Sequence, residues 1–508
     1  MGKAAPARIL TPGAVRRRAI LGKRASVSLL RVHWKVEDQD HVLRPTSLDD
    51  ISAFDFPPDV LQDSFLETYN EYCFAWCPVI EPADLDSTSP LLKNALALAA
   101  SQIKPNAIHR ASPEEYYNKA KKYFYEGQEA NPITAIKAIL LFYWWSPISP
   151  LICSQDSIWW WTGMAIRMAQ EIGLHREPDA SIPPHERGLR RRIWWTLFAR
   201  ERLTALSQGR PCLINLADCD VKEPVLEDFP DPQDVRAETF IQWVRLCRII
   251  GAMSEHVTRP NAAMPFPSYL FDQLGDWIAE LPGHLMLKIA TSRTIQFNRE
   301  VSLLFLPYLT AVTLLQFTRT GETATPKAGT TAMLAATCVA RTFQDLLLRG
   351  GIRYLPAISG WYITVALLAL LSARRVENLA SMANEHIQIL QIALNELSTV
   401  YAGTDIAVSV FERLIGASSV PAEMDDLDGP SSDSACLRLF PFVTPQTNDL
   451  VSALLDSSQA QISQQLLSGP DFMLQFDELL DMVQNIPPLP EQIPTTSSAD
   501  RALPDCTA

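Results

Sequence analysis

Apolar residues recur at spacings of three and four along most of the chain between residues 60 and 416. In one stretch, Trp161, Ala165 and Met168 fall on the same face of a helix with 3.6 residues per turn, and Gly173 follows as a residue type that ends helices. No segment shows the sustained alternation of apolar and polar residues that a half-buried strand would have. The pattern therefore predicts an all-α protein with a large helical body.

A second helix is predicted directly after this one. Pro184 suits the first turn of a helix, and the sequence Gly209-Arg210-Pro211 marks the end of the helix. The apolar residues between these points cover a broad face. We expect the core to include side chains from both helices, namely Trp161, Met168, Ile193, Trp194, Leu197 and Phe198.

Further helices are predicted on both sides of this pair. Ser112 and Glu115 have the spacing of a capping box at the start of a helix, and Gly127 ends that helix. The uncharged segment Val301–Phe317 is shorter than the ~20 residues of a membrane span, so we expect a buried helix there. The other predicted helices are Leu91–Ile103, Glu238–Val257, Leu270–Leu285, Glu300–Thr318, Lys327–Arg349, Ile358–Ala373, Val376–Tyr401 and Ala407–Ile415.

The charge of the chain is unevenly placed. The 508 residues carry a net charge of −13, so the whole molecule is not built as a polycation for nucleic acid. Residues 1–36 hold nine Lys or Arg and no acid, whereas residues 420–508 hold fourteen Asp or Glu and two Arg. We therefore predict a basic, largely disordered arm at 1–55, a helical body at 56–418, and an acidic, flexible tail rich in Pro and Ser at 419–508.

The cysteines and the short motifs give no sign of catalytic or metal chemistry. The nine cysteines are odd in number and scattered, which favours reduced thiols, and we interpret Cys73 and Cys77 as buried thiols because no second pair lies nearby. The chain has none of the short motifs of phosphate-binding loops, serine hydrolases or zinc proteases. We therefore predict that the chain is not an enzyme, and we assign no catalytic, cofactor-binding or metal-binding residue.

Several ordered blocks around the two central helices resemble one protein family. The blocks are G-x-A-x-R-M-A-x-x-x-G-L-H-R at 163–176, R-R-R-x-W-W at 190–195, Glu201-Arg202, Gly209-Arg210-Pro211 and the segment 220–224. They are similar to the regulatory domain of fungal zinc-cluster transcription factors, of the xylanolytic-activator type. The resemblance implies an all-helical regulatory domain in which these signature residues are structural: Gly163, Arg167, Gly173, Arg191, Trp194, Trp195, Arg202, Gly209, Arg210 and Pro211. Related sequences usually have Asp where Glu201 stands, so the geometry of a Glu201–Arg202 polar network stays open.

Some of these residues also allow a functional interpretation. The triplet Arg190, Arg191 and Arg192 could form a nucleic-acid patch, but ion pairs with neighbouring helices are favoured for a triplet inside a helix. The pair Trp194-Trp195 could stack on bases, but a place in the core is favoured. A lone His175 just after a helix end is more typical of a capping or packing residue than of a ligand or base.

A short basic cluster in the arm is the candidate for nuclear import or phosphate binding. It consists of Arg16, Arg17, Arg18, Lys23 and Arg24. A solvated charge run explains the same residues equally well, and the family resemblance favours import into the nucleus.

The family usually begins with a six-cysteine module that binds two zinc ions and places a helix in the DNA major groove. The first cysteine of this chain is Cys73, and no C-x2-C pair occurs. We therefore expect the chain to lack this module and to hold no zinc, because the module was lost, because the gene product is truncated or mis-spliced, or because the protein works without it.

One apolar segment stands out in the acidic tail. In the segment Asp471–Val483, apolar side chains that include Phe472, Phe476, Leu479 and Leu480 form a face among acidic residues. Such a segment can fold into the hydrophobic groove of a partner or dock on the body of its own chain, and partner binding is favoured because prolines flank it.

Taken with the resemblance, these features predict a nuclear fungal regulator of RNA polymerase II transcription. The target genes would be metabolic or secondary-metabolite genes. Expected partners are transcription machinery or co-regulators, DNA contacted directly or through another protein, and a second subunit in a homo- or heterodimer, with no membrane. The first alternative is a co-regulator that lost its DNA reader and acts through a DNA-binding partner. An unrelated helical enzyme or scaffold is the weaker alternative, because a fold can bring catalytic residues together from distant positions.

Overall fold

The computed structural model describes the chain from residue 59 to residue 442 with interruptions. The interruptions are 85–88, 106–110, 149, 151, 259–266, 290–293, 295, 319–326, 329, 375–378, 405–406, 410, 413–414 and 416–437. The basic cluster at 16–24 and the tail segment at 471–483 lie outside the described residues.

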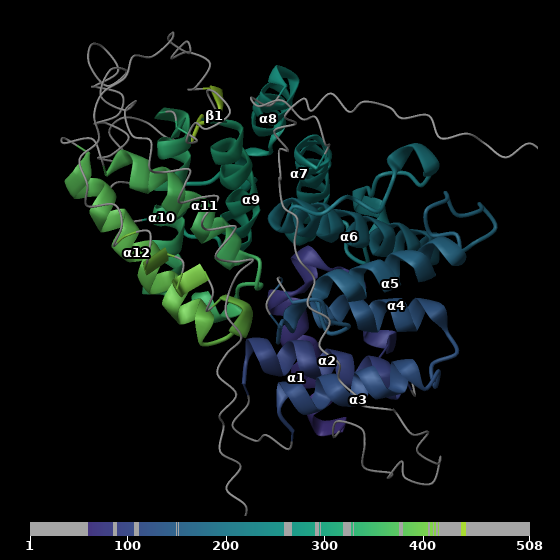
Figure 1. Ribbon diagram of the computed structural model, residues 1–508. Coiled ribbons are helices and arrows are strands. Elements are labelled where there is room, and N and C mark those ends of the chain that lie inside the picture. The colour runs from purple at the N-terminus through teal and green to yellow at the C-terminus, as the bar shows by residue number, and fades with distance from the viewer. Residues whose placement is uncertain are drawn as a thin grey trace, which may run out of the picture. The chain divides into compact units, whose positions relative to one another are not determined.

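The described residues form twelve α-helices, so the predicted all-α class is confirmed (Figure 1). The helices are α1 (Asp59–Tyr72), α2 (Pro90–Ile103), α3 (Pro113–Tyr125), α4 (Pro132–Leu141), α5 (Ile158–Glu171), α6 (Pro184–Gln208), α7 (Val235–Val257), α8 (Ser268–Glu280), α9 (Arg299–Leu315), α10 (Thr330–Leu348), α11 (Ser359–Ala373) and α12 (Ala380–Ser398). Short 3-10 helices occur at η2 (Phe74–Trp76), η3 (Pro82–Asp84), η4 (Phe142–Trp144), η5 (Leu216–Asp218), η6 (Leu226–Asp228), η7 (Gly283–Leu285), η8 (Ile352–Tyr354) and η9 (Ala402–Thr404).

The ends of several helices follow from single residues in the sequence. Ser112 and Glu115 form the predicted capping box at α3, in which Ser112 Oγ accepts the Glu115 N–H at 3.2 Å and the Glu115 carboxylate accepts the Ser112 N–H at 2.7 Å. Gly173 and Gly209 follow α5 and α6 with φ angles of 75° and 59°, the left-handed conformation that glycine adopts without strain. Both central helices are therefore ended by the residues that the sequence indicated.

The helices bury one continuous hydrophobic core. Helix α2 packs against α1, α3 and α4, and α6 packs against α5 and α7. Helices α9, α10, α11 and α12 pack together, and α7 contacts both α8 and α9 (Figure 1). Of the six residues expected in the core, Trp161, Ile193, Trp194, Leu197 and Phe198 are buried, and Met168 is partly buried against them.

The structure corrects the predicted ends of several helices. Helix α9 stops at Leu315 and α10 begins at Thr330, because residues from the two predicted ends pair as short antiparallel strands, β1 (Phe317–Thr318) and β2 (Lys327–Ala328). Phe317 pairs with Ala328 and Thr318 with Lys327, so the ladder takes up backbone groups that the pattern had assigned to helices. Helix α12 likewise begins at Ala380.

The segment expected as a buried apolar helix is α9, which carries Pro307 in its interior and buries that residue. No helix among the described residues is both long enough and apolar enough to cross a membrane.

Five residues beyond the predicted end of the body also pack on it. Residues 438–442 contact α8 and α9, and Leu439 and Phe440 are buried there. The boundary at 418/419 stays a prediction, but these five residues belong to the folded body in the structure.

Truncating a buried tryptophan of α6 tests the core assignment. Trp194 is fully buried, and removal of such a side chain leaves a cavity that costs about 3–5 kcal/mol. We expect Trp194→Ala to lower the free energy of unfolding by that amount in urea titrations. The matched control is Trp160→Ala on α5, because Trp160 is 41% exposed and its loss should cost far less. Equal effects of the two substitutions would contradict the assignment.

Candidate functional site

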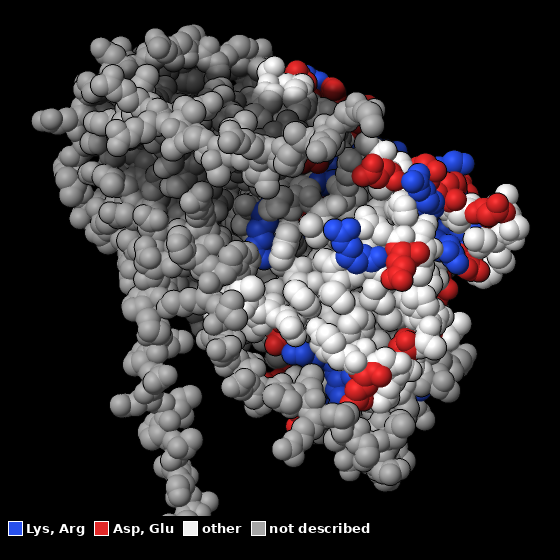
Figure 2. All heavy atoms as spheres, turned by 45° about the vertical axis from the view of Figure 1, so that its right-hand side comes forward, with Lys and Arg blue, Asp and Glu red and all other residues white. Residues whose placement is uncertain are grey.

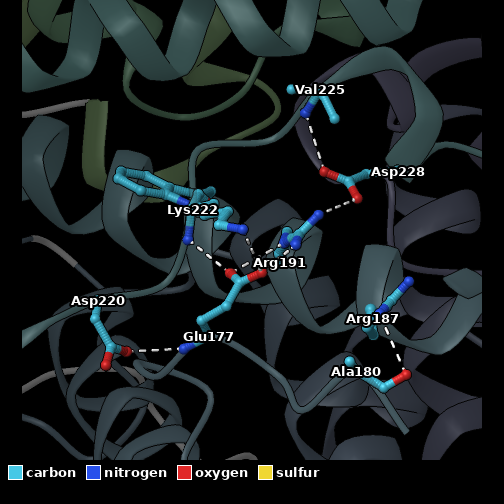
Figure 3. A network of polar contacts seen from close by, with 9 residues as sticks. Glu177, Ala180, Arg187, Arg191, Asp220, Lys222, Val225 and Asp228 are labelled. Atoms are coloured by element: carbon cyan, nitrogen blue, oxygen red, sulfur yellow. Dashed lines mark hydrogen bonds and ion pairs between the residues drawn. The ribbon is translucent and has the colours of Figure 1, made fainter. Parts of the chain in front are cut away.

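The signature residues of the sequence meet around α6. Arg191 of this helix lies between two carboxylates from different parts of the chain (Figure 3). Its guanidinium pairs with Glu177, which follows α5, and its Nη1 lies 2.7 Å from Asp228 Oδ1 in η6. The Arg191 and Asp228 side chains are only 14% and 6% exposed, so the pairs are shielded from water. Arg191 thus holds the loop that carries Glu177 and the segment that carries Asp228 against α6.

The two carboxylates also organise the backbone of the loops that carry them. Glu177 Oε2 accepts the Lys222 N–H at 2.9 Å, and the Glu177 N–H donates to Asp220 Oδ1 at 2.8 Å (Figure 3). Asp228 Oδ2 accepts the Val225 N–H at 3.0 Å. Burial alone would raise the pKa of Glu177, but hydrogen bonds from Arg191 and the Lys222 N–H hold this pKa below its ordinary value. The carboxylate is therefore kept charged as a structural anchor.

A glycine allows this close approach of α6 to the loop. A Cβ atom on Gly188 would lie 2.5 Å from the Asp228 carbonyl oxygen, a distance that backbone atoms cannot accommodate without shifting. Gly188 lies one turn before Arg191, so the contact and the ion pair position the same loop. Sequence analysis missed this residue, because a glycine inside a helix gives no sign of which backbone approaches it.

The other two arginines of the triplet are paired as well. Arg190 Nη2 lies 2.9 Å from Glu186 Oε1 on the preceding turn, and Arg192 Nη2 lies 2.6 Å from Glu81 Oε1. Arg192 is almost fully buried. Figure 2 shows that on the face turned forward, cations and carboxylates of the described residues are interspersed. The geometry of the triplet is that of ion pairs with neighbouring segments.

The tandem tryptophans lie in the interior. Trp194 is fully buried and its ring centre lies 5.9 Å from that of His175. Trp195 is 3% exposed and its Nε1 donates to the Lys222 carbonyl at 2.7 Å. The His175 carbonyl accepts the N–H groups of Asp220 and Val221, so His175 helps to hold the same loop. In this arrangement neither indole can stack on a base.

A second polar network lies further along α6. Glu201 Oε1 accepts the Leu213 N–H at 2.6 Å, and its other oxygen lies 3.5 Å from Arg202 Nε. Arg202 also reaches Glu255 Oε1 on α7 at 3.1 Å and donates to the Ile214 carbonyl. The Glu201–Arg202 geometry that the sequence left open is thus a buried pair that anchors the loop after α6.

Close packing surrounds this pair. A Cβ on Gly251 of α7 would lie 2.6 Å from Arg202 Cδ, so the glycine leaves room for the arginine side chain. Burial raises the pKa of Glu201 to about 7, although the charge of Arg202 acts in the opposite direction.

The remaining signature residues end or brace the two central helices. Arg210 is buried, its guanidinium lies 5.2 Å from the Trp159 ring centre, and its Nη2 donates to the Pro150 carbonyl at 2.8 Å. Pro211 is exposed beside it. On α5, a Cβ added to Gly163 would lie 3.7 Å from a Leu213 methyl group, an ordinary contact distance. Arg167 is exposed, and its Nη1 donates a hydrogen bond to Gln170 Oε1. None of these contacts has the form of a reactive centre.

One buried cation was not anticipated from the sequence. Arg200 is 2% exposed, and its guanidinium lies 4.3 Å from the Tyr143 ring centre and 4.7 Å from the Trp144 ring centre. It also donates to the Leu140 carbonyl. The adjoining cavity has a volume of about 10 Å³, which is room for one water molecule rather than an effector. The run of four aromatic residues at 142–145 is the one feature of the sequence that could have indicated a site for a buried cation.

The thiols of Cys73 and Cys77 and two larger cavities lie away from the signature residues. Burial raises the pKa of Cys73 and Cys77 above the ordinary value, which keeps these thiols protonated. Within the described ranges, no three His, Cys, Asp or Glu side chains are grouped so that they could hold a metal ion. A cavity of about 250 Å³ is lined by residues that include Asp345, and another of about 600 Å³ by residues that include Arg353. Neither lining contains a signature residue.

The raised pKa of Glu201 predicts a pH dependence of stability. The pKa of Glu201 is higher in the folded protein, about 7, than in the unfolded chain, about 4.3. Its contribution to the free energy of unfolding is therefore complete below about pH 4.3 and is lost as the pH rises through about 7. Glu201→Gln keeps an acceptor for the Leu213 N–H and does not titrate. We expect the free energy of unfolding of the wild type, relative to this variant, to fall by up to roughly 3 kcal/mol between pH 4.5 and pH 8.

The measurement is urea unfolding across this pH range. Glu255→Gln is the matched control, because Glu255 contacts the same arginine but its side chain is 46% exposed. Parallel pH profiles of the wild type and Glu201→Gln would show that Glu201 titrates normally.

Comparison with known proteins gives a consistent picture. The model of the fungal specific transcription factor domain matches residues 60–270. The chain is 25% identical over 477 residues to cutinase transcription factor 1 alpha of Fusarium vanettenii, an alignment that covers 81% of this chain and 51% of that protein. It is 26% identical over 394 residues to the acetamidase regulatory protein of Aspergillus fumigatus, with 71% and 49% covered. No solved structure matches significantly.

The chain thus spans about half the length of these curated relatives. A further relative, cutinase transcription factor 1 beta of Fusarium vanettenii, is 31% identical over 209 residues, which cover 37% of this chain and 23% of that protein. The matched region contains α5, α6 and both loops that Arg191 holds. Residues 60–270 are thus similar to the fungal specific transcription factor domain, and the described part of this region is helical.

Proposed function

We propose that this protein is a fungal regulator of RNA polymerase II transcription that acts in the nucleus on metabolic or secondary-metabolite genes. The match of residues 60–270 to the fungal specific transcription factor domain carries the proposal. The names of the relatives support the gene class, since they are called a cutinase transcription factor, an acetamidase regulatory protein and an aurofusarin cluster transcription factor. The helical body is the regulatory part, and the proposal assigns it no catalytic activity.

Within this proposal, the α6 region supports architecture rather than DNA contact. Each arginine of the 190–192 triplet is paired with a carboxylate of the same chain, and both tryptophans beside the triplet are buried. Sequence readout in DNA needs side chains that are free to reach base edges. In this proposal, DNA is recognised by a zinc module or by a partner. Zinc is a cofactor only if such a module is present, and no cofactor is assigned to the residues of this chain.

The segments at the two ends of the chain complete the proposal. The cluster Arg16, Arg17, Arg18, Lys23 and Arg24 serves nuclear import, and the segment 471–483 contacts co-regulators or the transcription machinery. The alternative is a co-regulator that works through a DNA-binding partner.

The acidic tail segment should activate transcription when it is placed at a promoter. Residues 465–490 fused to an unrelated DNA-binding domain should switch on a reporter gene, because Phe472 and Phe476 can enter an apolar groove of a partner while the acidic residues keep the segment soluble. Phe472→Ala with Phe476→Ala should silence the fusion. A matched control exchanges Asp471 and Asp477 for Asn and should retain part of the activity. A wild-type fusion no more active than the bare DNA-binding domain would contradict this role.

Purified chain should bind DNA weakly and without sequence preference. If five cations of the arm at 16–35 neutralise phosphates, affinity should fall with salt at a log–log slope of about 4.5 and be nearly lost near ~0.2 M salt. Promoter and random DNA should compete equally in fluorescence anisotropy. Footprinting provides the decisive measurement, since protection of one defined site by the chain alone would point to a DNA reader in the helical body. The first residues to exchange would then be Arg190, Arg191 and Arg192.

A further inference from the structure

A short segment from far along the chain returns to the helical body. Residues 438–442 lie against α8 and α9, which also contact each other. Leu439 is fully buried and Phe440 is 2% exposed. The Tyr308 hydroxyl of α9 donates to the Leu439 carbonyl at 2.9 Å. The segment is therefore held both by apolar side chains and by its backbone.

The surface that receives the segment is aromatic. Trp277 of α8 is stacked on Tyr308 of α9, with ring centres 5.1 Å apart and planes inclined by 29°. Phe305 presents its edge to Tyr308 at 5.7 Å, and Phe442 of the segment packs edge-on against Phe305 at 5.1 Å. Offset and edge-on arrangements of this kind are the favourable ones for aromatic rings. We call this surface, together with the acidic turn of α8 described next, the α8–α9 docking site.

A cation at the start of the segment meets two carboxylates one turn apart. Arg438 Nη1 lies 3.6 Å from Asp272 Oδ1, and its Nη2 pairs with Asp276. Between these two aspartates in the sequence, Gly275 leaves space on the helix, because a Cβ there would lie 3.0 Å from Arg438 Nε. The aspartate side chains are 65% and 62% exposed, so water weakens the ion pairs. The ion pairs therefore fix the position of the segment along α8 more than they add binding energy.

We propose that the α8–α9 docking site is a peptide-binding site for a linear motif with the sequence Arg-Leu-Phe-x-Phe, which residues 438–442 of this chain occupy. The order of the motif supports this, since a cation, two buried apolar anchors and a terminal aromatic ring all come from five consecutive residues. Short peptides are recognised through such anchors, with polar contacts that fix direction. The outside occupant in this proposal is the same segment of a second copy of this chain, because this sequence already matches the site through its buried side chains, its backbone and its cation.

Capture of a labelled peptide by a chain with an undocked motif tests the proposal. The probe is a fluorescent peptide of residues 434–446, titrated against the full chain by anisotropy. Leu439→Asp with Phe440→Asp in the full chain should free the site, so that this variant binds the peptide saturably. The wild type should bind the peptide at least about tenfold more weakly, because its own motif competes. The peptide that carries Leu439→Asp should bind neither protein.

A charge exchange locates the binding to this surface. Asp272→Lys with Asp276→Lys, added to the undocked variant, should weaken the wild-type peptide severalfold, and a peptide with Arg438→Glu should recover affinity for the altered site. If the undocked variant keeps its helical circular dichroism yet binds no peptide, the segment is a fixed part of the fold and the proposal is wrong.

A cleavage experiment covers the case in which the undocked variant does not fold. A protease recognition sequence placed between residues 424 and 430 of the otherwise wild-type chain allows the connection to be cut after folding. Excess unlabelled peptide should then release the fragment that carries residues 438–508 in size-exclusion chromatography. Retention of the fragment at saturating peptide would overturn the proposal.

Discussion

A helix covered on every side can keep charged side chains in the interior only if each charge is met by a partner. The part of helix α6 from residue 192 to residue 205 is in this position, and its Arg192, Glu201 and Arg202 are each at most 2% exposed. Removing one partner from such a pair leaves an uncompensated buried charge, which costs several kcal/mol. The surrounding loops are therefore not free to vary in position. The course of the chain after α5 and after α6 follows from where the charges of α6 must be neutralised.

This constraint explains why the signature residues occur as separate blocks in the sequence. Arg191 needs Glu177 from one loop and Asp228 from another, and the Trp195 indole needs the Lys222 carbonyl between them. Each block supplies one half of a contact whose other half lies elsewhere. These contacts therefore fix one arrangement of the loops around α6.

The parts of the structure that could be predicted from the sequence depend on local rules. The all-α class, the capping box at Ser112 and the helix ends at Gly173 and Gly209 follow from periodicity and from the preferences of single residues. The parts that could not be predicted depend on which segments meet in space. The role of Gly188 depends on the approach of η6, which the sequence does not indicate. Residues 438–442 lie in a segment predicted to be an acidic tail, and only the structure shows that they contact Tyr308 and Phe305.

The folded unit extends beyond the region that the family model matches. Tyr72 of α1 stacks on Tyr354 at 4.4 Å, and the Gln102 side chain on α2 donates to the Val400 carbonyl at 3.1 Å. The Trp277 indole on α8 donates to the Gln242 carbonyl on α7 at 3.1 Å. In each contact one partner lies in residues 60–270 and the other beyond them. The later helices thus cover apolar and polar surface of the matched region, and α7 contacts α6 on one side and α8 and α9 on the other.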